Sequence, residues 1–335
     1  MRAFVVDKYG PAALRAAEVP EPTVGDRDVL VDVAAAGINP LDAMIRNGEF
    51  KLLLPYRRPF TLGHDVAGVV IAIGAEVTGF VVGDEVYARP RDLRVGTFAE
   101  RIAIDEHDVA HKPTSLTMEE AAAVPLVALA SWQALVELAA IRPGQRVLVH
   151  GGAGGLGATA VQLAHHLGAH VAATASAADT DKLRALGADE VLDYRSTDFA
   201  DVLSGLDVVL DTVGGANLEK SLTVLAPGGL AISLVGPPDP AFARQLGKPR
   251  LAPVMATLSA KIRRRARKLG VRYAFLFMHA DGPRLAELAT LYDAGALRPT
   301  LDRTFPFDQT PAALAYLEQG HAKGKVVVTR SPAEA

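Results

Sequence analysis

The apolar residues of this chain change their spacing near residue 124. Before that point they occur in short β-branched runs such as MRAFVVD, DVLVDVAAAGI and VAGVVIAIG, which are separated by Gly and Pro. Short apolar runs of this kind predict strands joined by irregular loops. The first 123 residues are therefore expected to form a compact β-rich unit.

After residue 124, segments with strand and helix spacing alternate. The strand-like RVLVHG, HVAATAS, EVLDY, LDVVLDTVG and LAISLVG are interleaved with helix-like segments such as LGATAVQLAHHLG and NLEKSLTVL. Parallel strands need crossover connections, so this order predicts an α/β fold whose parallel sheet is covered on both faces. The C-terminal LDRTFPFDQTPAALAYLEQGHAKGKVVVTR predicts strand, helix and strand, and SPAEA a frayed tail.

Length and composition indicate a two-domain globular protein and narrow its function. The 335 residues exceed what one hydrophobic core usually supports, and the net charge of −3 gives no reason to expect a nucleic acid or membrane partner. The absence of cysteine excludes disulfides and thiolate metal sites. No signal-peptide pattern or membrane-length apolar run is present, so a cytoplasmic protein is expected. The basic run KIRRRARK (261–268) is interpreted as a solvated helix face.

A glycine-rich turn is the strongest chemical signal in the sequence. In VLVHGGAGGLGATAVQLA, Gly152, Gly154 and Gly157 stand in G-x-G-x-x-G register between a predicted strand and a predicted helix. Glycines at these positions allow a tight turn, and backbone N–H groups at a helix N-terminus attract a pyrophosphate. The turn therefore predicts a dinucleotide cofactor.

Several segments together resemble the medium-chain dehydrogenase/reductase superfamily. They are AAGINPLDAMIRNG, PFTLGHDVAGVVIAIGAEVTGFVVGDEVYA, GTFAE, the glycine-rich turn and GKVVV. Within the superfamily the chain resembles the zinc-free quinone oxidoreductase branch, which includes zeta-crystallin. The resemblance implies a GroES-like catalytic domain formed by residues 1–123 and 271–335, a Rossmann cofactor domain formed by residues 124–270, a cofactor held in the cleft between them, and a homodimer. VRYAFLF is the candidate edge strand for the dimer contact.

The resemblance also implies site residues. Asn39 stands where zinc-dependent relatives carry a cysteine, so no metal is expected, and His64 is interpreted as a hydrogen-bonded turn residue. Asn39 is the candidate contact to the substrate oxygen, or else a residue that shapes the turn before Pro40; Tyr56 is a candidate proton donor, or else part of an exposed loop. The expected cofactor contacts are Ala130, Ser131, Gly152, Ala153, Gly154, Gly155, Leu156, Gly157, Ser176, Tyr194, Val213, Val235, Gly236, Phe277, Met278 and Lys325.

The residues after the second strand of the cofactor domain bear on cofactor choice. NAD-binding proteins usually place an acid there, whereas this chain has Ala175 and Ser176, which together with Tyr194 favour NADP(H); Asp179 opposes that preference. Without a metal to polarise a carbonyl, an electron-poor quinone or enone is the expected hydride acceptor. An enoyl-thioester or 2-alkenal reductase, and a non-catalytic crystallin-like NADPH-binding protein, remain alternatives.

Overall fold

The computed structural model describes residues 1–330, and the predicted frayed tail at 331–335 lies outside the described residues. The chain divides into two compact units. Unit 1 comprises Met1–Leu129 and His279–Ala335, and unit 2 comprises Ala130–Met278. Both divisions fall a few residues later than expected from the sequence.

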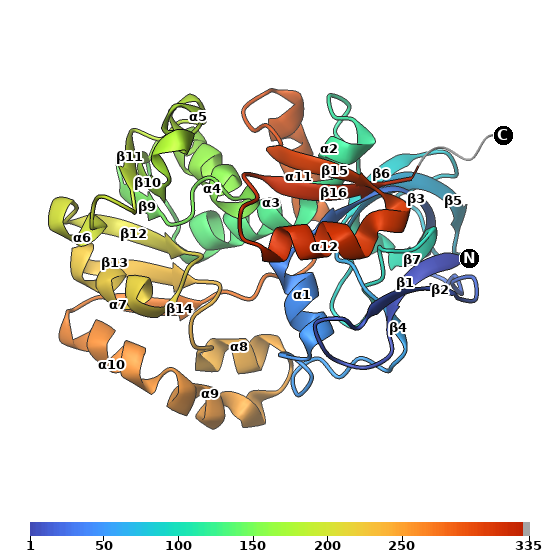
Figure 1. The fold of residues 1–335 in the computed structure, drawn as a ribbon, viewed down its shortest axis with the longest axis horizontal. Helices are drawn as coiled ribbons and strands as arrows, with labels where there is room; N and C mark the ends of the chain where they lie inside the picture. Colours follow the sequence, from blue (N-terminus) through green and yellow to red (C-terminus); the bar gives the residue numbers. More distant parts are fainter. Residues whose placement is uncertain (331–335) are drawn as a thin grey trace. The chain divides into compact units, whose positions relative to one another are not determined.

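Unit 1 is built around a seven-stranded sheet (Figure 1). Its central strand β3 (Asp28–Ile38) pairs antiparallel with β5 (Asp65–Ile73) on one side and with β16 (Lys325–Thr329) on the other. The order is β15-β16-β3-β5-β6-β8, with β7 also paired to β3. The remaining strands are β15 (Leu301–Pro306), β6 (Glu85–Ala88), β8 (Val109–His111) and β7 (Arg101–Asp105).

A smaller sheet and several helices complete unit 1. The small sheet has the order β2-β1-β4, formed by β2 (Leu14–Glu18), β1 (Arg2–Val6) and β4 (Phe60–Thr61). Helix α1 (Pro40–Asn47) begins with Pro at its first position and ends at Gly48, which has a φ of 85° that favours glycine. The other helices here are α2 (Met118–Ala122), α11 (Gly282–Asp293) and α12 (Thr310–Glu318).

Unit 2 contains a six-stranded, wholly parallel sheet with the order β11-β10-β9-β12-β13-β14 (Figure 1), as the alternating sequence pattern predicts. The strands are β9 (Arg146–Val149), β10 (His170–Ala175), β11 (Glu190–Asp193), β12 (Leu206–Asp211), β13 (Leu225–Ser233) and β14 (Arg272–Phe275). Its helices are α4 (Gly155–His166), α5 (Thr180–Ala185), α6 (Phe199–Val202), α7 (Gly215–Val224), α8 (Pro240–Gln245), α9 (Ala252–Leu258) and α10 (Ala260–Lys268). Leu148, Val209, Ala231, Leu222 and Ile262 contribute to one buried core cluster.

Two elements differ from the sequence-based expectation. The helix predicted after Pro125 is α-helical only in α3 (Pro125–Trp132) and continues as a π-helical turn over Gln133–Leu138. Strand β14 pairs in parallel with β13, with Ser233 opposite Phe275, so this segment belongs to unit 2 rather than to the catalytic domain to which it was assigned. Within residues 1–330, no helix has the length and apolar character needed to cross a membrane.

Candidate functional site

The glycine-rich turn connects β9 to α4 and is tightly packed. Gly151 has a φ of 65°, and the Gly152 N–H donates to Thr174 O at 2.9 Å. A Cβ on Gly157 would lie 2.2 Å from Gly151 O, so only glycine allows the helix to start this close to the turn. Gly154 is the N-cap of α4 and contributes no side chain to the cap.

This turn fits a dinucleotide because the first N–H groups of α4 have no partners within the helix and carry the positive end of its dipole. A pyrophosphate would accept from those N–H groups, and the glycines leave no side chain in its way. Ala153, Gly155 and Leu156, also expected from the sequence, are the turn's remaining residues and are partly exposed.

The ends of β10 and β11 hold the residues expected to discriminate between cofactors. Tyr194 N donates to Ala175 O at 3.2 Å, which places Tyr194 beside the end of β10. The Ser176 hydroxyl donates to Asp179 Oδ2 at 2.5 Å, and the Asp179 side chain is buried. The Arg195 guanidinium lies 5.6 Å from the Tyr194 ring centroid. Serine, acid, aromatic ring and cation therefore lie at neighbouring strand ends.

The carboxyl ends of two further strands, β12 and β13, lie on the same side of the sheet as the glycine turn. Asp211, at the end of β12, accepts from Val213 N at 3.1 Å and from the Ser233 hydroxyl at 2.7 Å. Ser233 Oγ in turn accepts from Gly236 N at 2.8 Å. Strands β9, β12 and β13 are neighbours in a parallel sheet, so these loops lie along the edge that carries the glycine turn.

The other expected cofactor contacts differ in exposure. Val213 and Val235 are 54% and 48% exposed. Phe277 and Met278 are buried, and the Phe277 ring centroid lies 5.0 Å from that of Phe242. Ala130 and Ser131, in α3, are buried as well.

His150 is a residue of this edge that the sequence did not single out. It follows β9 and is fully buried, with its ring nitrogens 3.0 Å from Thr174 Oγ1 and 3.0 Å from Ser221 Oγ. Burial lowers the pKa of His150 to about 4, against a smaller opposing effect of Asp211. The ring is therefore neutral near pH 7 and ties β9 to β10 and α7. No local sequence pattern marks it, because its partners are 24 and 71 residues away.

In unit 1, three adjacent strands bring distant polar residues into one buried cluster. Asn39 follows the end of β3, Asp65 begins β5 and Lys325 begins β16. Asn39 Nδ2 donates to Asp65 Oδ2 at 2.9 Å. Lys325 Nζ donates to Asn39 Oδ1 at 2.5 Å and to Asp65 Oδ2 at 2.9 Å. The exposed fractions are 1% for Asn39, 0% for Asp65 and 5% for Lys325, so all three side chains are shielded from solvent.

Asp42 and His64 extend this cluster. One Asp42 oxygen lies 2.6 Å from His64 Nδ1, and the other accepts from Asn39 N at 2.7 Å. Asp65 Oδ1 accepts from Leu126 N at 2.8 Å. His64 is thus the hydrogen-bonded residue that its sequence context suggests, although its Nε2 is buried without a hydrogen-bond partner within residues 1–330.

Tyr56 makes its contacts outside the Asn39 cluster. Its hydroxyl accepts from Leu93 N at 3.3 Å, and its ring stacks on Phe60 with centroids 4.7 Å apart. Tyr56 is half-buried, less exposed than the loop alternative implied, and burial is the largest effect that raises the pKa of its phenol. Neither contact joins it to the Asn39 cluster, so its role as a proton donor stays a prediction.

The residues of unit 1 do not fit a zinc ion. Within the described part of the chain, no three His, Cys, Asp or Glu side chains are grouped so that they could hold a metal. Zinc prefers thiolate and imidazole ligands, and here Asn39 and an ammonium group stand beside His64 and Asp65. The Lys325 ammonium already neutralises Asp65, the carboxylate that a metal would need.

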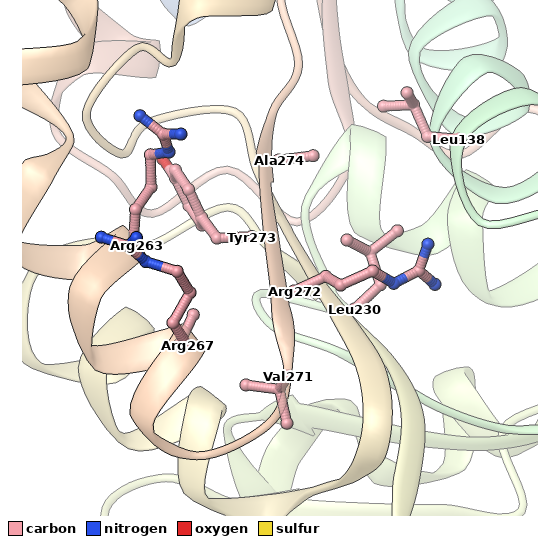
Figure 2. A pocket seen from close by; sticks show the side chains of 9 residues that line it. Leu138, Leu230, Arg263, Arg267, Val271, Arg272, Tyr273 and Ala274 are labelled. Atoms are coloured by element: carbon pink, nitrogen blue, oxygen red, sulfur yellow. The ribbon is translucent and has the colours of Figure 1, made fainter.

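A separate shallow hollow of about 410 Å³ lies at β14 in unit 2 (Figure 2). Arg263 and Arg267 reach it from α10, while Arg272 extends to the opposite side of the strand (Figure 2). The basic helix presents the predicted solvated face, because the cations at 261, 264, 265, 267 and 268 are exposed and only Ile262 and Ala266 are buried. Its Lys261 and Arg265 pair with Glu219, but Arg263 and Arg267 have no acidic partner within residues 1–330.

A GroES-like sheet unit joined to a parallel-sheet unit with a glycine turn defines a two-domain oxidoreductase that uses a nicotinamide cofactor. Residues 25–114 match the alcohol dehydrogenase GroES-like domain and residues 186–328 match the zinc-binding dehydrogenase family. The chain belongs to the medium-chain dehydrogenase/reductase superfamily, in its quinone oxidoreductase branch.

Three known proteins illustrate this relationship. The chain is 37% identical to the mitochondrial NAD(P)H oxidoreductase RTN4IP1 of Mus musculus, over 98% of this chain and 89% of that protein. It is 34% identical to the 2-methylene-furan-3-one reductase of Solanum lycopersicum, over 99% and 80%. The structure of the quinone oxidoreductase from Coxiella burnetii superposes with a TM-score of 0.86 at 29% identity, covering 98% of this chain and 99% of that one.

Proposed function

We propose that the protein is an NADP(H)-dependent reductase that transfers a hydride, without a metal, to quinones or related activated enones. The observation that carries the proposal is the buried cluster in which the Lys325 ammonium, and no set of metal ligands, accompanies Asn39 and Asp65. A carbonyl substrate that needs a Lewis acid would find none among these groups. A quinone or enone is already electron-poor, so a hydrogen-bond donor is sufficient to assist its reduction.

The edge of the unit 2 sheet is the proposed cofactor site. The N–H groups at the start of α4 would hold the pyrophosphate, and the exposed Val213 and Val235 would contact the cofactor along the neighbouring strand ends. Ser176, Tyr194 and Arg195 would hold the 2′-phosphate of NADP(H). Bound NADPH would supply the hydride. The mouse relative is named as an NAD(P)H oxidoreductase, which supports a nicotinamide cofactor of either kind.

Asp179 would weaken a preference for NADPH over NADH, because its carboxylate accepts a hydrogen bond from the Ser176 hydroxyl that would otherwise bind the phosphate. A comparable affinity for both cofactors would show that Asp179 outweighs Ser176 and Tyr194.

A second candidate substrate class is supported by one relative. The tomato protein is named as a reductase of an exocyclic enone, which favours enones over quinones. A 2-alkenal or enoyl-thioester reductase would use the same cofactor and the same fold. Arg57 and Arg58 are exposed and would be the candidate contacts for the phosphates of a CoA or carrier-bound thioester.

The test is the oxidation of NADPH and of NADH, followed by absorbance, with a panel of quinones, alkenals and enoyl thioesters. We expect turnover of quinones or enones with NADPH and no loss of activity after chelation of metals. Binding of NADPH without turnover of any acceptor would instead favour the crystallin-like alternative. A preference for enoyl thioesters that Arg57→Ala or Arg58→Ala abolishes would favour the second class.

The oligomeric state and the cellular location are also part of this proposal. We expect a homodimer formed at the β14 edge. A cytoplasmic location also stays a prediction, to be tested by cell fractionation, because the mouse relative is mitochondrial by name.

A further inference from the structure

The contacts of Lys325 fix the orientation of the Asn39 side chain. An ammonium group only donates hydrogen bonds, so the Asn39 atom at 2.5 Å from Lys325 Nζ must be the amide oxygen. An ionised carboxylate only accepts, so the Asn39 atom at 2.9 Å from Asp65 Oδ2 must be the amide nitrogen. An amide turned by 180° would face both partners with the wrong atom.

This arrangement leaves one hydrogen of the Asn39 amide for another acceptor. The nitrogen carries two hydrogens, and Asp65 takes one of them. The ammonium pulls electron density toward the amide oxygen, which makes the remaining N–H a stronger donor, and the effect is large because the cluster excludes water. Asp65 is held in turn by Leu126 N at 2.8 Å.

We propose that Lys325 is a positioning residue of the reductase: it stands in for a metal cation, orients the Asn39 amide together with Asp65, and directs the remaining N–H to the carbonyl oxygen of the acceptor. This inference rests on the proposed function, because it names the group that assists the acceptor. It differs from a contact between Lys325 and the cofactor, which the family resemblance alone suggests.

The chemistry of an enone shows why this N–H matters. The β-carbon accepts a hydride with its two electrons, the C=C π pair moves to the adjacent C–C bond, and the carbonyl π pair becomes the negative charge of an enolate oxygen. A proton from water then adds to the α-carbon, and the cofactor leaves oxidised as NADP⁺. The oxygen gains charge only during hydride addition, so a polarised N–H aimed at it stabilises the transition state more than the bound substrate.

The central variant is Lys325→Met, which keeps the length of the side chain and removes the charge. Lys323→Met is the matched control, because Lys323 is exposed and lies two residues away. Lys325→Met leaves the Asp65 carboxylate buried without its cation, so it is expected to lower the Tm. The double variant Lys325→Met/Asp65→Asn removes both charges, and a recovered Tm with activity still low separates folding from catalysis.

We expect Lys325→Met to lower kcat for an enone by about tenfold to a hundredfold, with the Kd for NADPH changed by no more than roughly twofold. Lys323→Met should match the wild type. In an Asn39→Ala background, Lys325→Met should lower kcat little further, because Lys325 acts through Asn39. A full additional loss in that background would overturn the proposal, as would an unchanged kcat with a weakened Kd for NADPH.

A measurement independent of turnover distinguishes failure of this inference from failure of the proposed function. Nuclear magnetic resonance should show one exchange-protected Asn39 side-chain N–H in the wild type and loss of that protection in Lys325→Met. If the wild type reduces no acceptor, the proposed function fails, and this measurement still decides whether Lys325 positions the amide. Unchanged protection in Lys325→Met would contradict the positioning role.

Discussion

Burial of the His150 ring makes the free energy of unfolding depend on pH. The folded-state pKa of His150 is about 4, below its ordinary value of 6.5. Between these values the unfolded chain binds a proton at this residue and the folded chain does not, so stability rises with pH across this window. Lowering the pH from 7 to 4 should therefore cost about 3 kcal/mol of unfolding free energy through this residue alone.

Urea denaturation of the wild type and of His150→Gln at several pH values measures this contribution. The variant should be less stable at pH 7, where it loses contacts to Thr174 and Ser221, and should show a shallower fall in stability between pH 6.5 and pH 4. His321→Gln, at an exposed residue, is the control and should retain the wild-type pH dependence. Equal slopes for the wild type and His150→Gln would contradict a neutral buried ring.

Single residues were predictable where a local pattern or a resemblance marks them. Asn39 and Lys325 were both candidates, but their contact joins residues 286 positions apart and depends on which strands become neighbours. The partnership of His64 with Asp42 had no sequence signal either. Such buried networks are determined by strand order and register, which hydrophobic spacing does not specify.

At the scale of elements, substitutions in the glycine turn can separate an effect on packing from an effect on cofactor binding. Gly154 has a φ of −71°, and a Cβ there would be 3.4 Å from Gly151 O, an ordinary contact. Gly154→Ala should therefore preserve the Tm but weaken NADPH binding by about tenfold or more, because a methyl group would stand where the pyrophosphate approaches. Gly157→Ala should lower both Tm and affinity, because its Cβ would lie 2.2 Å from Gly151 O.

Differential scanning fluorimetry and a fluorescence titration with NADPH measure the two effects. An unchanged Kd in Gly154→Ala would mean that the turn does not approach the cofactor. The chain's Gly79→Ala variant serves as a control, because a Cβ at this turn would meet no atom closer than 3.9 Å.

Elements were predictable where apolar spacing was regular. The order of strands and helices in unit 2 follows from the sequence because each buried strand is a short apolar run and each crossover helix has an apolar face. The spacing gave no sign that α3 continues as a π-helical turn, or that β14 ends at Phe275 while Leu276–Met278 stay buried. These boundaries depend on tertiary packing, which outweighs local preference.

At the scale of the whole molecule, the two-unit organisation was expected from chain length and from the change in apolar spacing. The return of the C-terminal segment to unit 1 was implied by the family resemblance, not by spacing. It is physically necessary here, because β16 pairs with β3 and covers an edge that would otherwise be open. The first residue of β16 is Lys325, so the return of the C-terminal segment also completes the polar cluster of Asn39, Asp65 and Lys325.

The β14 edge is where a homodimer is expected. On its outer side the N–H groups of Val271 and Phe275 are taken by Ala266 O at 3.0 Å and by Asp239 Oδ2 at 3.2 Å. Tyr273 lies between them and is opposite Ala231 of β13, so the edge can pair with a second copy only over a short length around this residue. Pairing would also bring Arg263, Arg267 and Arg272 of two copies together.

Like charges at this contact predict that salt strengthens the dimer, because screening over about 10 Å at 0.1 M ionic strength weakens their repulsion. Sedimentation equilibrium at low and high salt should give a dimer whose dissociation constant falls as salt rises. Arg267→Ser should tighten the dimer at low salt, whereas Arg264→Ser, an exposed residue of α10 that does not line the hollow, should have a smaller effect. A monomeric mass at every concentration would contradict the homodimer, and a dimer that salt weakens would place the contact away from these arginines.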